Sequence, residues 1–308
     1  MSPVRILLGT LTASLIALNT AFWVLMFVPF IVIKLLAVPL RNQALERFAS
    51  LALMRCASYW VEGNSRIVTL APPIRWDVEG IEKLDLASSY LVISNHQSWV
   101  DIFALQHVFR DRIPFLKFFL KQQLIWVPLL GIAWWALDFP FMKRYSRAAM
   151  DKHPELRGKD IETTRRYCQK YRNYPVSVIN FLEGTRRTPK KQQNSPYRHL
   201  LRPKAGGVAL VLAAMGDQLR EVIDVTIDYP GSDTRRLFWR LLSGGIPVVV
   251  IRVRRLPVPE QVAGRDYQND PEYQARIKDW VNEIWADKDE QLEAMGHRAG
   301  MPVESTHG

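Results

Sequence analysis

The chain has 308 residues, of which 48% are hydrophobic and 23% are charged. This length suits one large domain with an appendage, and the ordinary globular composition excludes extensive disorder. The formal net charge of +11 favours a polyanionic partner, either nucleic acid or an anionic lipid surface. Cys56 and Cys168 show neither metal-type spacing nor a disulfide framework, which is typical of a reducing compartment.

The N-terminal segment helps to choose between these partners. Residues 6–33 contain no charged side chain, and the run LTASLIALNTAFWVLMFVPFIVI is apolar almost throughout. Since roughly 20 apolar helical residues cross a bilayer, we expect a retained membrane anchor here. A cleaved signal peptide is the competing interpretation, but the run is longer than an ordinary signal h-region. Pro29 could divide the run into a span and an interfacial piece, or into a hairpin that re-enters the membrane.

The arginines around this run predict its orientation. Three follow it and one precedes it, namely Arg41, Arg47 and Arg55 against Arg5. By the positive-inside rule the main domain is expected to face the cytoplasm, at the inner membrane if the protein is bacterial. We expect residues 1–60 to form the anchor and an interfacial helical segment, and residues 61–308 to form the main domain.

Alternating and apolar runs in the main domain predict strands and helices. The expected strands are residues 74–80, 90–95, 176–182, 222–227 and 246–253. Helical patterns occupy residues 41–70, 160–173 and an amphipathic C-terminal stretch at 271–295. Strands that alternate with helices indicate an α/β domain.

A nearly continuous apolar segment, residues 124–142, interrupts this pattern. The first interpretation is a helix and a strand buried around the core. The alternative is a surface that meets lipid or receives an acyl chain.

The first candidate for chemistry is the sequence NHQSWVD at residues 95–101. An alcohol is a poor nucleophile until a base removes its proton, and a neutral imidazole suits that task near pH 7. His96 follows a predicted strand, and Asp101 in the next helix could hold the ring in one tautomer. The spacing alone is weak, because Asp101 could instead be only the acid of a capping box that begins at an N-cap Ser98.

The second candidate, Phe181-Leu182-Glu183-Gly184-Thr185-Arg186, also follows a predicted strand, where α/β sheets place ligand sites. Gly184 would let backbone approach a ligand, and Thr185 and Arg186 offer contacts to a phosphate. Glu183 could orient that arginine or hold an acceptor hydroxyl. The plain alternative is a charged turn after a strand.

A third cluster, Phe141-Met142-Lys143-Arg144, places cations beside the apolar segment. This arrangement suits a phosphate head group whose acyl chains lie in lipid. A solvated basic face is the alternative interpretation.

The order NHQSWVD, PFMKR, FLEGTR and RPKAGG resembles the 1-acylglycerol-3-phosphate acyltransferase family. The resemblance covers roughly residues 74–257, and four ordered motifs are more specific than any one of them. The KR of the second motif and the strand VIDVTIDYP resemble the branch with lysocardiolipin and lysophosphatidylinositol acyltransferases. Leu182 stands where many members have proline.

The resemblance implies a mixed β-sheet flanked by helices, with an N-terminal helical element on the membrane. His96 looks like the general base and Asp101 like its orienting carboxylate. The acceptor-phosphate site would comprise Arg144, Glu183, Gly184, Thr185 and Arg186. No cofactor and no metal are implied, since the acyl donor would be acyl-CoA or acyl carrier protein.

The reaction expected is transfer of a fatty acyl chain to the sn-2 hydroxyl of a lysophospholipid. Lysophosphatidic acid is the first choice of acceptor, and lysophosphatidylglycerol or lysocardiolipin is the second. The membrane bilayer is an expected partner and nucleic acid is not. Two rivals stay open: a hydrolase that releases fatty acid to water, and a non-catalytic membrane-tethered protein that binds nucleic acid or anionic lipid.

Overall fold

The computed structural model describes residues 2–37, 39–142, 159–171, 174–233, 236–265, 267 and 269–299. Its centre is a six-stranded sheet in the order β1-β8-β7-β2-β6-β3. These strands are Arg75–Glu79 (β1), Ser89–Ser94 (β2), Leu116–Phe118 (β3), Ser177–Phe181 (β6), Leu219–Asp228 (β7) and Val248–Leu256 (β8). All neighbours run parallel except β7 and β8, so the sheet is mixed, as the resemblance implied.

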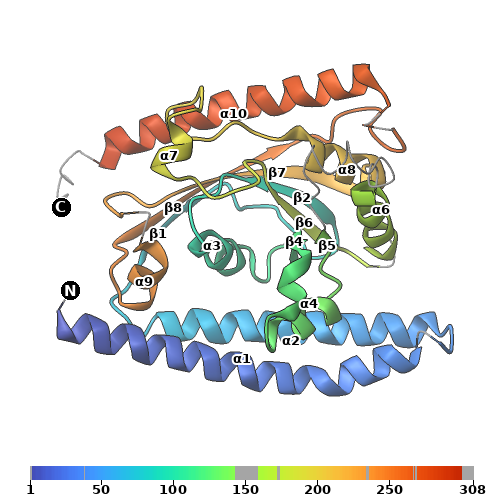
Figure 1. Cartoon of the computed structure of the whole chain (residues 1–308), viewed down its shortest axis with the longest axis horizontal. Coiled ribbons are helices and arrows are strands. Elements are labelled where there is room, and N and C mark those ends of the chain that lie inside the picture. The colour runs from blue at the N-terminus through green and yellow to red at the C-terminus, as the bar shows by residue number, and fades with distance from the viewer. Residues whose placement is uncertain are drawn as a thin grey trace.

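Helices cover both faces of the sheet (Figure 1). One face carries α1 (Pro3–Ala37), α2 (Gln43–Val68), α3 (Val100–Phe109), α4 (Leu130–Ala136) and α9 (Leu237–Leu242). The other carries α6 (Lys159–Tyr171), α8 (Ala205–Met215) and α10 (Pro271–Ala299). The alternation of strand side chains explains the two layers, because Tyr90 and Val92 join one core while Leu91 and Ile93 join the other.

The N-terminal apolar run and the mixed segment after it form a helical hairpin. Helix α1 continues through Pro29, so this proline does not divide it. The amide of Asn19 donates to the carbonyl of Trp60 over 3.0 Å, and the ring of Trp23 stacks on that of Tyr59 at 5.8 Å. Helix α2 ends at Val68, so it passes through the expected boundary at residue 60.

The apolar segment at residues 124–142 is only partly buried. It forms a 3-10 turn at Gln122–Trp126, then α4, then the short strand β5 (Phe141–Met142), which pairs with β4 (Leu120–Lys121). Ala133 and Ala136 join the core, whereas Trp126 is 85% exposed and Ile132 55% exposed. The interpretation as a wholly buried helix and strand is therefore wrong for one side of this segment.

Candidate active site

The candidate base and its carboxylate meet where β2 passes into α3. Nδ1 of His96 lies 2.8 Å from Oδ2 of Asp101, which is completely buried. The ring of His96 stacks on Phe181 with centroids 4.0 Å apart, and its side chain remains 14% exposed. Because Nδ1 faces the carboxylate, Nε2 is left as the nitrogen that can accept a proton.

Asp101 is held by four hydrogen-bond donors. The backbone amides of Gln97 and Ser98 donate to Oδ2 over 2.6 and 2.9 Å, beside Nδ1 of His96. The phenol of Tyr229 donates to Oδ1 over 2.7 Å. Burial and the charge of Asp101 raise the pKa of Tyr229 well above its usual range, so the phenol stays a donor. A carboxylate with both oxygens satisfied is held in position to orient the imidazole.

The helix start differs from the predicted capping box. The N-cap of α3 is Trp99, which makes no side-chain cap bond, and the hydroxyl of Ser98 instead accepts from the amide of Val100 over 3.3 Å. The carboxylate of Asp101 reaches back to the amides that precede the helix. Asp101 therefore both organises the start of α3 and orients His96, so the two interpretations of this residue do not exclude each other.

The loop after β2 is also locked to β7. The side chain of Asn95 exchanges two hydrogen bonds with the backbone of Ile227, both at 2.9 Å. The side-chain amide of Gln97 donates to the same carbonyl over 2.8 Å. These polar side chains are buried, so each must find a partner inside the protein. The consequence is that His96 leaves the sheet on a rigid backbone.

Glu183 lies beside this loop at the end of β6. Its Oε1 accepts a long, 3.4 Å bond from the amide of His96, while Oε2 is buried without a hydrogen-bond partner. Burial raises the pKa of Glu183 from its ordinary 4.5 to about 8. Near pH 7 the neutral acid is therefore favoured, which removes the repulsion that a carboxylate would exert on a bound phosphate.

Gly184 turns the chain after Glu183 with a φ of +64°, a left-handed conformation that favours glycine. A Cβ there would lie 3.2 Å from Cδ of Lys204, so the turn also brings the backbone close to a basic side chain. The amide of Arg187 donates to the carbonyl of His96 over 2.9 Å. The turn of the second motif is thus bonded directly to the first.

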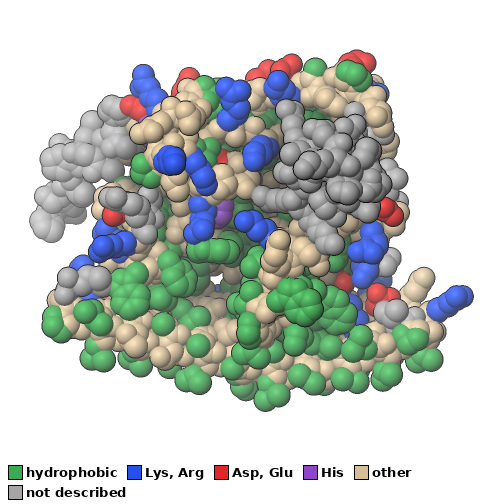
Figure 2. All heavy atoms as spheres, in the orientation of Figure 1, with side chains coloured by type: hydrophobic (Ala, Val, Ile, Leu, Met, Phe, Trp, Pro, Cys, Tyr) green, Lys and Arg blue, Asp and Glu red, His purple; other side chains and the backbone are tan. Residues whose placement is uncertain are grey.

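The two polar residues of this turn project from it. Nζ of Lys191 donates to the hydroxyl of Thr185 over 2.6 Å. The guanidinium of Arg186 lies over the ring of Trp99, 5.2 Å from its centroid. Figure 2 shows Lys and Arg side chains gathered on this face, with a histidine among them. The structure therefore brings together six of the seven predicted site residues: His96, Asp101, Glu183, Gly184, Thr185 and Arg186. Arg144 lies outside the described residues.

Helix α10 holds the basic loop, residues 185–204, which continues from this turn. Asp289 accepts hydrogen bonds from the amides of Arg198 and His199 over 2.8 and 2.7 Å. The indole of Trp285 donates to the carbonyl of Leu201 over 2.8 Å. This helix was predicted only as an amphipathic stretch, and its role in holding the loop was missed because the contacts span 84 to 91 residues.

Tyr229 was missed in a similar way. It stands in the sequence VIDVTIDYP, which was used only as a branch signature, and lies 128 residues from Asp101. No local pattern joins the two residues, because only the pairing of β2 with β7 brings them together. A polar aromatic residue just after a buried strand was the one available signal.

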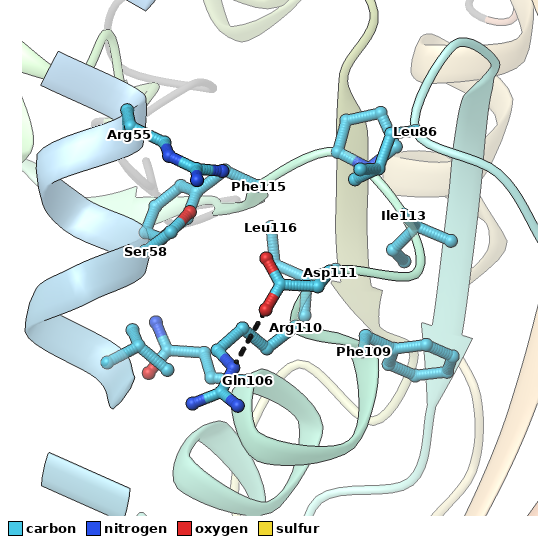
Figure 3. A pocket seen from close by; sticks show the side chains of 12 residues that line it. Arg55, Ser58, Leu86, Gln106, Phe109, Arg110, Asp111, Ile113, Phe115 and Leu116 are labelled. Carbon is cyan, nitrogen blue, oxygen red and sulfur yellow. Dashed lines mark hydrogen bonds and ion pairs between the residues drawn. The ribbon is translucent and has the colours of Figure 1, made fainter. Parts of the chain in front are cut away.

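A separate hollow of about 80 Å³ lies between α2 and the end of α3 (Figure 3). Ser58, Gln106, Phe109 and Leu116 are among the residues that line it. Leu116 begins β3, so the hollow is at the amino ends of the parallel strands, whereas His96 and Glu183 follow carboxyl ends. Since α/β sheets bind ligands beyond the carboxyl ends, the reaction is expected at His96 and not here.

Comparisons with known proteins identify a family for this chain. A family model described as Acyltransferase matches residues 75–230. The 1-acyl-sn-glycerol-3-phosphate acyltransferases delta and gamma of Mus musculus are 24% and 26% identical, covering 65% and 70% of this chain. The matches cover 51% and 55% of those relatives, so the chain spans about half their length.

A solved structure, the 1-acyl-sn-glycerophosphate (LPA) acyltransferase PlsC from Thermotoga maritima, is also similar. It is 18% identical with a TM-score of 0.45, over 88% of this chain and 97% of that one. The family model alone covers half of the chain and includes His96, Asp101, Glu183 and Tyr229. This chain is therefore a member of the acyltransferase family.

Proposed function

We propose that the protein transfers a fatty acyl chain from a thioester to the sn-2 hydroxyl of lysophosphatidic acid, giving phosphatidic acid. The observation that carries this proposal is the contact of 2.8 Å between His96 and the fully buried Asp101, beside a basic turn. The names of the relatives support this acceptor, which contains both a free hydroxyl and a phosphate.

In the proposed reaction Nε2 of His96 removes the proton of the acceptor hydroxyl as its oxygen attacks the thioester carbonyl. The C–S bond of the tetrahedral intermediate then breaks, and the proton passes from His96 to the leaving thiolate. No serine or cysteine nucleophile is needed, because the donor is already activated. Either acyl-CoA or acyl carrier protein would serve as this donor.

Three backbone amides near the site are already hydrogen-bonded and so are not free to stabilise an oxyanion. The amides of Gln97 and Ser98 are committed to Asp101, and the amide of Gly184 to the carbonyl of Phe181. The neutral form of Glu183 supplies an O–H in this region, so it can donate a hydrogen bond to the acceptor or to the developing charge. Thr185 and Arg186 would bind the acceptor phosphate, together with Arg144.

The helical hairpin is proposed to lie along one side of the bilayer. Among the described residues, one helix, Pro3–Ala37, is long and apolar enough to cross a membrane. This helix packs along α2 and also contacts α4 and α9, so several elements of the domain hold it in place. Figure 2 shows hydrophobic side chains along this side of the molecule. An interfacial orientation leaves these contacts intact and gives the acceptor a short path from the membrane.

The experiment is acyl transfer from labelled acyl-CoA, and separately from acyl carrier protein, to a panel of lysophospholipids in membranes. The panel includes lysophosphatidic acid, lysophosphatidylglycerol and lysocardiolipin. His96→Ala is expected to abolish turnover, whereas the control His107→Ala retains it, because His107 stacks on Trp76 at 4.3 Å in the last turn of α3, away from the loop that carries His96. More than about a tenth of the parent rate in His96→Ala would rule out the base assignment. Release of free fatty acid alone would indicate a hydrolase.

A further inference from the structure

A basic hollow of about 510 Å³ lies between the N-terminal end of α1 and α9. Its lining includes the three arginines Arg5, Arg236 and Arg240, one carboxylate, Asp233, and the indole of Trp239. The three guanidinium groups outnumber the single carboxylate, so the hollow favours an anion. None of these residues belongs to the proposed acyl-transfer site.

One wall of the hollow is held in place by packing of Trp239 and by a hydrogen bond of Arg240. The ring of Trp239 packs against the backbone of α1 at Gly9, where an added Cβ would come within 2.8 Å of Cζ2. Nε of Arg240 donates to the carbonyl of Gly245 over 2.8 Å, which holds its guanidinium in place. The absence of a side chain at Gly9 therefore allows α9 to approach α1 and gives the hollow a defined shape.

Two of the arginines remain available for a ligand. The side chains of Arg5 and Arg236 are exposed and form no hydrogen bond or ion pair within the part of the chain that the structure describes. A phosphate carries several acceptor oxygens, and guanidinium groups match them with two parallel N–H donors.

Exposed apolar side chains adjoin these arginines in the sequence. Val4 is 71% exposed and Leu7 72% exposed on α1, and Phe238 is 54% exposed between Arg236 and Arg240. A phosphate site beside apolar side chains suits a molecule with a charged head and hydrocarbon chains. Such a molecule is present at high concentration where an apolar helix meets an anionic bilayer.

We propose that this hollow binds the phosphate of an anionic bilayer phospholipid, with Arg5 and Arg236 as its principal ligands. The bound lipid is a docking ligand and not a reactant. This inference rests on the interfacial orientation proposed above, but it does not depend on the identity of the acyl acceptor.

The test is the partition of the full chain, carried over from detergent, between buffer and vesicles of two compositions. One set contains phosphatidylcholine alone, and the other contains phosphatidylcholine with phosphatidylglycerol. The variant is Arg5→Gln/Arg236→Gln. The matched control, Arg276→Gln/Lys278→Gln, removes two positive charges from α10 on the opposite side of the sheet. A second control, Arg41→Gln/Arg47→Gln, removes two charges near the other end of the helical hairpin.

The gain in partition produced by phosphatidylglycerol is expected to fall about tenfold or more in Arg5→Gln/Arg236→Gln. It should fall much less in both controls, and partition onto phosphatidylcholine alone should be unchanged. An equal loss in the Arg41→Gln/Arg47→Gln control would overturn the proposal in favour of diffuse surface charge. An unchanged gain in the Arg5→Gln/Arg236→Gln variant would also overturn it.

Acyl transfer in detergent micelles separates this inference from the proposed function. The Arg5→Gln/Arg236→Gln variant should retain the parent rate there, because its site is not the reaction site. A loss of micellar turnover with normal folding would show that the hollow is part of the active site, which contradicts a separate docking site. If the parent binds phosphatidylglycerol through these arginines but transfers no acyl chain, the docking site stands and the proposed function fails.

Discussion

The phenol of Tyr229 donates a hydrogen bond of 2.7 Å to Oδ1 of Asp101, the carboxylate whose other oxygen faces His96. The three residues come from three places in the chain: the end of β2, the first turn of α3 and the end of β7. Tyr229 therefore acts on the candidate base through Asp101, as a positioning residue.

Tyr229→Phe should lower turnover by roughly ten- to hundredfold, with little change in KM for either substrate. A hydrogen bond to a charged group contributes about 1.5–3 kcal/mol, and its loss frees the carboxylate to rotate away from the imidazole. Steady-state kinetics with the acyl donor and the acceptor varied in turn would measure the effect on turnover separately from the effect on each KM.

Tyr273→Phe is the matched control for that variant. Its phenol is also buried, but it donates to the carbonyl of Ala209 over 3.1 Å, between α10 and α8. Both variants should lower the free energy of unfolding, and only Tyr229→Phe should lower turnover. Equal turnover in the two would contradict the positioning role.

Asp289→Asn should raise KM for the phosphate-bearing acceptor roughly three- to tenfold and leave kcat nearly unchanged. The asparagine amide keeps one acceptor oxygen but presents N–H groups to one of the two backbone amides that Asp289 now binds, so the basic loop loses part of its support. KM for the donor should not move.

The same helix offers a control for this variant in Asp279→Asn. Asp279 is exposed and lies two turns and more before Asp289, on the part of α10 that precedes the contacts with the loop. Asp279→Asn should match the parent in both parameters. A rise in both KM values for Asp289→Asn, or a general loss of kcat, would indicate a structural role only.

Glu183 is expected to make stability depend on pH. Its pKa is about 8 in the folded protein against an ordinary 4.5, so the folded state binds the proton more tightly than the unfolded state. The contribution of Glu183 to the free energy of unfolding is therefore fully present below the ordinary pKa of 4.5. It is lost as the pH rises through about 8.

Glu183→Gln imitates the neutral acid and should flatten this dependence. Denaturant unfolding of parent and variant at several values between about pH 5 and about pH 9 would measure the difference in free energy of unfolding. The difference should grow in favour of the variant as pH increases. A difference that does not change with pH would show that Glu183 titrates normally.

Lys288→Met should destabilise the fold by about 3 kcal/mol or more, because removal of one partner leaves a buried charge partly uncompensated. Nζ of Lys288 lies 2.7 Å from Asp224, and both side chains are completely buried. Thermal unfolding would show this loss. The exposed Lys278→Met on the same helix should change the free energy of unfolding by less than about 0.5 kcal/mol.

Most strands and helices could be predicted because their signals are local. The apolar run at residues 90–95 appears as β2, Ser89–Ser94. The amphipathic stretch at residues 271–295 appears as α10, with Ile277, Val281 and Trp285 packed into the core. The prediction was wrong for Ser98 as the N-cap of α3 and incomplete for residues 124–142. Short apolar runs do not show by themselves which side is covered, since that depends on neighbours far along the chain.

The pair of His96 and Asp101 could be predicted from the ordered motifs, and a separation of five residues lets one turn bring the ring and the carboxylate together. Gly184 was predicted only as a place where the backbone approaches a ligand, and its left-handed conformation is a local backbone property that favours glycine. Long-range packing is what places Tyr229 against Asp101, Asp289 against the basic loop, and Arg5 and Arg236 at one hollow. The physical reason is that these contacts follow from strand order and helix packing, which bring together residues that no local periodicity connects.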